Sequence, residues 1–300
     1  MIPFVRDMAF AYGVADQVSP LIRRVVAENP GPFTYLGTGT YIVGRGDVAV
    51  IDPGPLMDAH LAAILKATEG ERIVAILTTH THIDHSPLAS PLQAISGAPI
   101  YGRADPKTDS GFEEAGEASF RPDIEIADGA QVSGPGWTLE ALATPGHASN
   151  HVAYALLEEN ALFSGDHVMG WSTTVVSPPD GDMGAYYASL ETVRAREFAT
   201  LWPTHGPPVT EVEPFLTAYR AHRLAREAQI LAALSAGPTT IKAMVPVMYA
   251  AVDPRLHPAA AHSVLAHLIH LTRQGQVVAD ATSAADAPSI NSTFRLSRLG

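Results

Sequence analysis

The chain has 300 residues, of which 46% are apolar and 17% are charged, with 24 glycines and 24 prolines. This composition excludes a disordered, collagen-like or coiled-coil protein, and no uncharged apolar run approaches the ~20 residues of a membrane-spanning helix. The net charge of −12 disfavours polyanionic partners, and the absence of cysteine excludes disulfides and thiolate metal ligands. Because the first twenty residues carry no signal-peptide pattern, we expect a cytoplasmic protein without a membrane partner.

The first two thirds of the chain predict strands alternating with helices. β-branched runs at 38–43 and 47–51 flank a Gly-Arg-Gly turn and predict a hairpin, which is followed by a helix at 58–68. The nearly continuous apolar run at 72–79 is typical of a strand buried on both faces. Further strands are predicted at 138–143, 152–157 and 161–164. Together these elements predict an α/β layered fold.

The last part of the chain is rich in alanine and leucine. It predicts helices at 212–235, 239–250 and 257–274, and then two strands at 276–280 and 291–297. Three helices followed by a two-stranded wing are the order of a winged helix-turn-helix domain.

Composition and charge also change near residue 213, where prolines interrupt the pattern. Residues 1–213 hold 11 Lys/Arg against 27 Asp/Glu, a net charge of −16, whereas residues 214–300 hold 8 against 4, a net charge of +4. We therefore predict a catalytic domain over 1–213 and a winged-helix-like domain over 214–300.

The segment His80-Thr81-His82-Ile83-Asp84-His85 directly follows the predicted strand at 72–79. Alternation along an extended chain points His80 and His82 to one side, and a turn could aim Asp84 and His85 at a neighbouring point, so that one loop serves two metal ions. The alternative, a polar loop in solvent, is weaker because clustered histidines and carboxylates are typical of metal sites.

Three more candidate ligands follow strands further along the chain. His147, Asp166 and His205 each have a neighbouring glycine. A single histidine at a strand end is more often a hydrogen-bonded surface residue, but three such positions together with the segment 80–85 predict a metal site.

This set of residues resembles the metallo-β-lactamase superfamily, whose His-x-His-x-Asp-His motif is matched in full by residues 80–85. The resemblance implies an αββα sandwich that binds two Zn²⁺ per chain at one edge of its sheets. By this resemblance, one zinc is held by His80, His82 and His147, the second by Asp84, His85 and His205, and Asp166 bridges the two.

Differences within the superfamily narrow the activity. The cysteine-bearing lactamase subclass needs a thiolate where this chain has Asp166, so we do not expect a true β-lactamase. The chain is more similar to the glyoxalase II, ribonuclease and phosphodiesterase branches. With its winged-helix tail, it most resembles the lactamase-like endoribonuclease family, whose members divide between nuclease and thioester-hydrolase activities.

Two cations ~3.5–4 Å apart lower the pKa of a shared water to near 7, which supplies a metal-bridging hydroxide. We predict Asp84 and Asp166 as catalytic residues. The acid that protonates the leaving group stays open between Asp84, a metal-bound water and His151. His151 is interpreted either as a strand-start residue in solvent or as a substrate contact. Asp52 is interpreted either as a partner of a ligand histidine, by the family pattern, or as a turn residue.

Three functions follow from these observations. We favour a dinuclear zinc hydrolase of a small ester or thioester. The alternative is a zinc-dependent endoribonuclease or phosphodiesterase acting on single-stranded RNA, and a non-enzymatic winged-helix regulator with a metal-bound sensor domain ranks third. The stretch 105–128, with eight acidic residues, counts against RNA. The oligomeric state stays open.

The tail has two interpretations of its own. One polar face of the predicted helix at 257–274 could be presented to nucleic acid. Alternatively, the tail could pack on the catalytic domain and shape its cleft. The side chains of that polar face are Ser263, His267, His270, Arg273 and Gln274.

Overall fold

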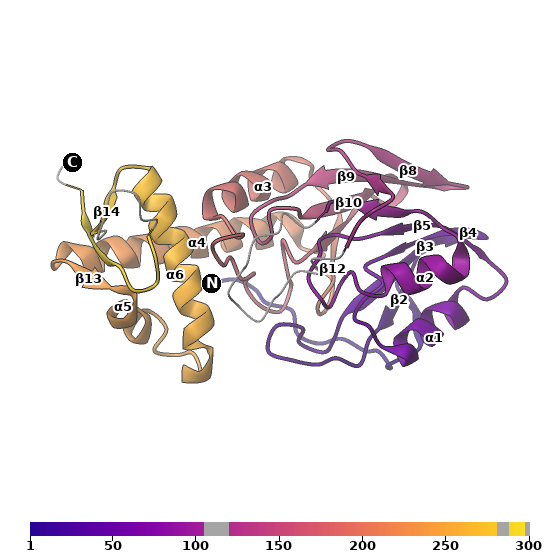
Figure 1. Cartoon of the computed structure of the whole chain (residues 1–300), viewed down its shortest axis with the longest axis horizontal. Helices are drawn as coiled ribbons and strands as arrows, with labels where there is room; N and C mark the ends of the chain where they lie inside the picture. Colours follow the sequence, from indigo (N-terminus) through magenta and orange to yellow (C-terminus); the bar gives the residue numbers. More distant parts are fainter. Residues whose placement is uncertain (105–119, 281–287, 298–300) are drawn as a thin grey trace.

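The structure is a computed structural model that describes residues 1–104, 120–280 and 288–297. Residues 105–119, which belong to the acidic stretch predicted to disfavour RNA, lie outside the described residues. Figure 1 shows a large lobe built of two facing sheets and a smaller lobe that contains the last helices.

The first sheet has seven strands in the order β1-β2-β3-β4-β5-β6-β7. Strands β1 to β4 pair antiparallel and β4 to β7 pair parallel. The predicted hairpin is confirmed as β3 and β4. The strands span Ala15–Gln17, Ile22–Val26, Gly39–Arg45, Asp47–Ile51, Arg72–Leu77, Ile100–Gly102 and Ile124–Glu125.

The second sheet has five strands in the order β12-β11-β10-β9-β8, and β11 and β12 are parallel. Its inner face packs against the first sheet through side chains such as Tyr41 of β3 and Tyr154 of β10. The strands β8 to β12 span Gln131–Gly134, Trp137–Ala143, Val152–Leu156, Ala161–Gly165 and Thr200–Pro203.

Helices cover both outer faces, which completes the predicted αββα sandwich. α1 (Asp58–Ala67) and α2 (Ala89–Ser96) pack on the first sheet, and α3 (Met183–Ala195) and the start of α4 (Val212–Ser235) pack on the second. The prediction that β5 is buried on both faces is confirmed, because Ile76 packs with α1 and α2 while Leu77 faces the second sheet.

The small lobe is a winged helix. The end of α4 packs with α5 (Ile241–Met248), α6 (His257–Arg273) and a sheet of order β13-β15-β14. These strands span Thr239–Thr240, Thr293–Leu296 and Val277–Asp280. None of the helices among the described residues is long and apolar enough to cross a membrane.

Helix α4 belongs to both lobes. It begins where we predict the domain boundary, and Phe215 near its start packs in the core of the large lobe, whereas Leu234 near its end packs in the core of the small lobe. The division into 1–213 and 214–300 stays our proposal.

The polar face of α6 is turned toward the large lobe. His267 is fully buried and its Nδ1 lies 3.2 Å from Glu227 Oε1 of α4, Ser263 is 9% exposed, and Arg273 forms an ion pair with Asp182. Arg273 and Gln274 of the same face are exposed, so the interpretation that this face is presented to nucleic acid stays a prediction. The alternative prediction is confirmed in its first part, since the tail packs on the catalytic domain. That the tail also shapes the cleft stays a prediction.

Candidate metal centre

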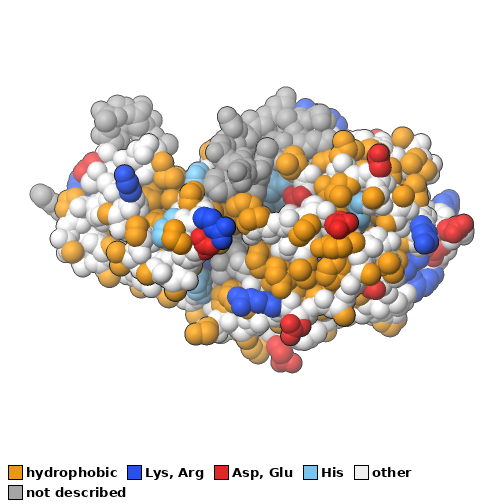
Figure 2. All heavy atoms as spheres, turned by 90° about the horizontal axis from the view of Figure 1, so that it is seen from below, with side chains coloured by type: hydrophobic (Ala, Val, Ile, Leu, Met, Phe, Trp, Pro, Cys, Tyr) orange, Lys and Arg blue, Asp and Glu red, His pale blue; other side chains and the backbone are white. Residues whose placement is uncertain are grey.

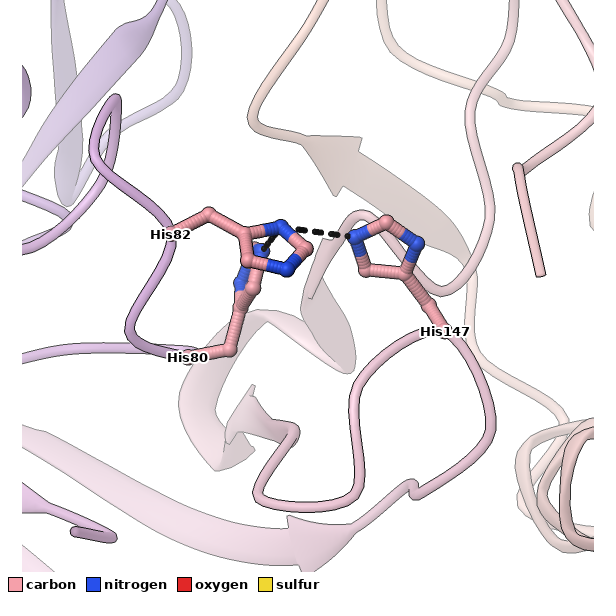
Figure 3. A group of neighbouring side chains, drawn as sticks. All are labelled: His80, His82 and His147. Atoms are coloured by element: carbon pink, nitrogen blue, oxygen red, sulfur yellow. Dashed lines mark hydrogen bonds between the residues drawn. The ribbon is translucent and has the colours of Figure 1, made fainter. Parts of the chain in front are cut away.

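Three histidines form the first part of the centre. His80 and His82 lie in the loop after β5, and His147 lies in the loop after β9. His80 Nε2 is 2.8 Å from His82 Nδ1, which is 3.2 Å from His147 Nε2. Figure 3 shows the three rings converging from these two loops.

The second part contains a carboxylate. Asp84 Oδ2 lies 3.1 Å from His205 Nε2 and 3.5 Å from His85 Nε2. Asp166 lies between the two parts: its Oδ1 is 3.7 Å from His85 Nε2 and 3.5 Å from His205 Nε2, and its Oδ2 is 3.8 Å from His147 Nε2. The structure thus brings all seven predicted ligand residues together.

The two parts differ in electrostatics. Burial, together with the neighbouring His147, lowers the pKa of His82 to about 3. Burial also lowers the pKa of His205, but the carboxylates of Asp166 and Asp84 outweigh it and raise this pKa to about 10. The histidines of the second part therefore hold protons that offset its carboxylates, whereas His80 and His82 of the first part are neutral at pH 7.

The arrangement fits divalent cations. The donor atoms of His80, His82 and His147 all lie within 4.8 Å of one another, and so do those of Asp84, His85 and His205. Among the described residues, His85 Nε2 and Asp166 Oδ1 are buried without a hydrogen-bond partner, although both point into the centre. Because unpaired polar atoms are costly to bury, a cation between them would satisfy both.

Hydrogen bonds behind the ligand histidines fix which ring nitrogen faces the centre. His147 Nδ1 donates to the carbonyl of Val175 at 2.7 Å, and His205 Nδ1 donates to the carbonyl of Gly37 at 3.2 Å. Since a carbonyl can only accept, Nδ1 of each ring carries a proton, and Nε2 is the nitrogen that faces the centre and would bind a metal.

Asp52 supplies the same support to His85. This buried carboxylate lies 2.9 Å from His85 Nδ1 and accepts hydrogen bonds from the Thr79 amide, the Thr79 hydroxyl and the Thr204 hydroxyl at 2.7–2.8 Å. The predicted contact with a ligand histidine is confirmed, and Asp52 also forms the turn after β4, with φ +47°. Sequence reasoning missed both threonines, although each directly precedes a ligand histidine.

His151 supports a ligand from behind. It is fully buried, so the interpretation that it faces solvent is wrong. Its Nε2 accepts a hydrogen bond from the backbone amide of Asp166 at 3.2 Å, and its Nδ1 lies 2.7 Å from the Thr144 hydroxyl. Because the only proton of the neutral ring is then held toward Thr144, His151 positions Asp166 and has no proton for a leaving group.

Comparisons with known proteins agree with this geometry. Residues 35–205 match the model of the metallo-beta-lactamase superfamily, and residues 240–285 match that of the beta-lactamase associated winged helix domain. An Aspergillus chevalieri protein named atrochrysone carboxyl ACP thioesterase is 36% identical over 222 residues, which are 73% of this chain and 67% of that protein.

Solved structures extend the likeness to the fold of the whole chain. A beta-lactamase domain protein from Burkholderia ambifaria is 22% identical with a TM-score of 0.78, over 99% of this chain and 97% of that chain. A protein solved in a di-iron-bound form is 27% identical with a TM-score of 0.51, over 63% of this chain and 95% of that chain. The chain is therefore a hydrolase that belongs to the metallo-β-lactamase superfamily and carries the winged helix domain associated with it.

Proposed function

We propose that the chain is a dinuclear zinc hydrolase of a small ester or thioester. The observation that carries this proposal is the convergence of two groups of three donors, His80, His82, His147 and Asp84, His85, His205, with Asp166 between them. The relative named a thioesterase supports a thioester as the substrate, since it matches 73% of this chain at 36% identity.

Each residue has a role in this proposal. His80, His82 and His147 would hold one cation, Asp84, His85 and His205 would hold the other, and Asp166 would contribute a negative charge that offsets the repulsion between the two cations. Cations bound there would supply a water molecule activated for attack near neutral pH. We assign proton transfer to Asp84, because its side chain is 23% exposed, whereas the side chains of His85 and His205 are 0% and 1% exposed.

Zinc is the proposed metal because it commonly binds imidazole nitrogen and carboxylate oxygen, which are the donors present. Iron is the alternative, given the relative solved in a di-iron-bound form. Elemental analysis of protein purified without added metal distinguishes them: two zinc ions per chain are expected, and two iron ions would overturn the choice of zinc.

RNA is the competing substrate. The net charge of −16 over residues 1–213 repels a polyanion, and two side chains of the polar face of α6, His267 and Arg273, already bond to Glu227 and Asp182. We therefore propose a small-molecule substrate. We also propose that the protein is cytoplasmic, which cell fractionation tests.

A paired assay tests the substrate. The same preparation is given an acyl-thioester and a single-stranded RNA, and Asp84→Asn is assayed beside it to detect contaminating enzymes. We expect thioester hydrolysis that a chelator abolishes and that the variant lacks. RNA cleavage that disappears in the variant, without thioester hydrolysis, would establish the alternative instead.

A further inference from the structure

The segment between β11 and α3 contacts the metal-ligand loop that carries His147. The Val175 carbonyl accepts the hydrogen bond of His147 Nδ1 at 2.7 Å. The Ser149 amide donates to the Asp180 carboxylate at 3.0 Å, and the Asp182 amide donates to the Gly146 carbonyl at 2.9 Å. Residues 172–182 therefore hold this ligand loop at three points, one of them on the ligand histidine itself.

The same segment contacts the winged-helix side of the molecule. Ser177 Oγ lies 3.0 Å from His262 Nδ1 of α6, and the Asp182 carboxylate forms an ion pair with Arg273 at the end of α6. On the face shown in Figure 2, a basic side chain lies against an acidic one where the two lobes meet. Asp182 thus bonds α6 through its side chain and the ligand loop through its backbone.

Helix α3 is closely packed against both the loop that carries His147 and helix α6. A Cβ added to Gly146, beside His147, would lie 2.4 Å from the Cα of Tyr186 in α3, so the ligand loop touches the helix backbone. On another side of α3, a Cβ added to Gly184 would lie 3.0 Å from His270 Nδ1 of α6. The first turns of α3 are therefore in contact with the ligand loop and with α6, and a shift of α6 would be passed on to His147.

From these contacts we infer that the winged-helix domain positions the metal ligand His147, with Arg273 as its main positioning residue acting through Asp182. This inference rests on the proposed function, since it takes His147 to bind a metal. It assigns the tail a role in the metal centre itself.

Zinc binding to the metal-free protein tests the inference without any substrate. Zinc is titrated in competition with a chromophoric chelator, and the visible spectrum of the cobalt-substituted protein is recorded for the same variants. The variants are Arg273→Ala, its conservative counterpart Arg273→Lys, and Ser177→Ala, which removes only the hydroxyl that contacts His262. The matched control is Arg255→Ala, because Arg255 pairs with Asp253 within the winged-helix domain and is exposed.

We expect Arg273→Ala to weaken zinc binding at one site by about 3- to 10-fold, less than the loss of a direct partner of a ligand. Its cobalt spectrum should change as well. Arg273→Lys should restore part of the affinity, Ser177→Ala should weaken zinc binding less, and Arg255→Ala should match the wild type.

Wild-type affinities and cobalt spectra in both Arg273→Ala and Ser177→Ala would overturn the inference and leave the proposed function intact. Equal losses in Arg273→Ala and Arg255→Ala would also overturn it, because the effect would then be general. A wild type that binds no zinc would overturn the proposed function and this inference with it.

Discussion

Histidines are buried in two parts of the large lobe, and their surroundings differ. At the metal centre, His85 is fully buried and its two ring nitrogens face the carboxylates of Asp52, Asp84 and Asp166. On the buried face of α1, His60 is 2% exposed, its Nε2 lies 2.7 Å from the Thr40 hydroxyl, and its Nδ1 has no hydrogen-bond partner among the described residues. Burial alone therefore does not identify a ligand.

The surroundings decide the charge that each ring carries. Burial lowers the pKa of His60 to about 4, so this ring is neutral at pH 7. At His85, burial also acts to lower the pKa, but the three carboxylates raise it well above its usual value. A histidine among several carboxylates and other imidazoles is poised to exchange a proton for a metal, whereas a solitary one contributes only packing and one hydrogen bond.

The largest expected effect distinguishes the buried residues of the metal centre from the solitary buried His60. Asp166→Ala should lose bound metal and lower kcat/KM by ~10³-fold or more, about 4 kcal/mol in the barrier, because both cations lose a shared negative ligand. His60→Gln, a substitution at an equally buried site, should keep both metal ions. Elemental analysis and kinetics of the two variants at neutral pH make the comparison.

Full metal occupancy in Asp166→Ala would contradict the bridging role. Loss of metal in a correctly folded His60→Gln would instead show that the two classes of buried histidine are coupled.

A smaller effect on zinc affinity is expected at Asp52, which contacts the ligand His85 without binding a metal itself. Asp52→Asn should weaken zinc binding by about 10- to 100-fold, because an amide cannot replace the carboxylate opposite His85 Nδ1 while it also accepts from Thr79 and Thr204. Activity should recover at saturating zinc. The matched control is Asp47→Asn at the start of β4, where an exposed carboxylate pairs with Arg72. Equal zinc affinities in the two variants would contradict the role of Asp52.

The last expected effect concerns the stability of the fold in acid. Because the folded state holds the pKa of His60 at about 4 and the usual value is 6.5, the unfolded chain takes up this proton first as the pH falls. His60 should therefore cost the folded state about 2–3 kcal/mol of stability between pH 6.5 and 4. Urea denaturation of wild type and His60→Gln at both ends of this window measures the difference. Parallel losses in the two proteins would show that other groups control acid unfolding.

The sequence predicts most of the strand ends that form the centre. The apolar run of β5 and the segment 80–85 lie in one continuous stretch of sequence, so the strand and its ligands can be predicted without tertiary information. Asp166 and His205 were also found, because glycine marks the end of each strand there. The metal-binding roles of these residues stay predictions.

The partners of the buried polar groups could not be predicted. Thr40 and His60 are joined across 20 residues, and Glu227 and His267 across 40, with no local pattern to pair them. The periodicity of α6 shows that one of its faces is polar. It does not show which partners this face has, since Asp182 lies at the start of α3 and Glu227 lies in α4.

Helix α4 has a consequence for how the chain can be divided. Phe215, Leu216 and Tyr219 complete the core beneath the second sheet, although they follow the point where charge and composition change. A chain that ended at residue 213 would leave that apolar surface open to solvent, and one that began at 214 would carry these side chains without their core. Helix α4 thus supplies core side chains to both lobes, and a cut at residue 213 would separate the large lobe from part of its own core.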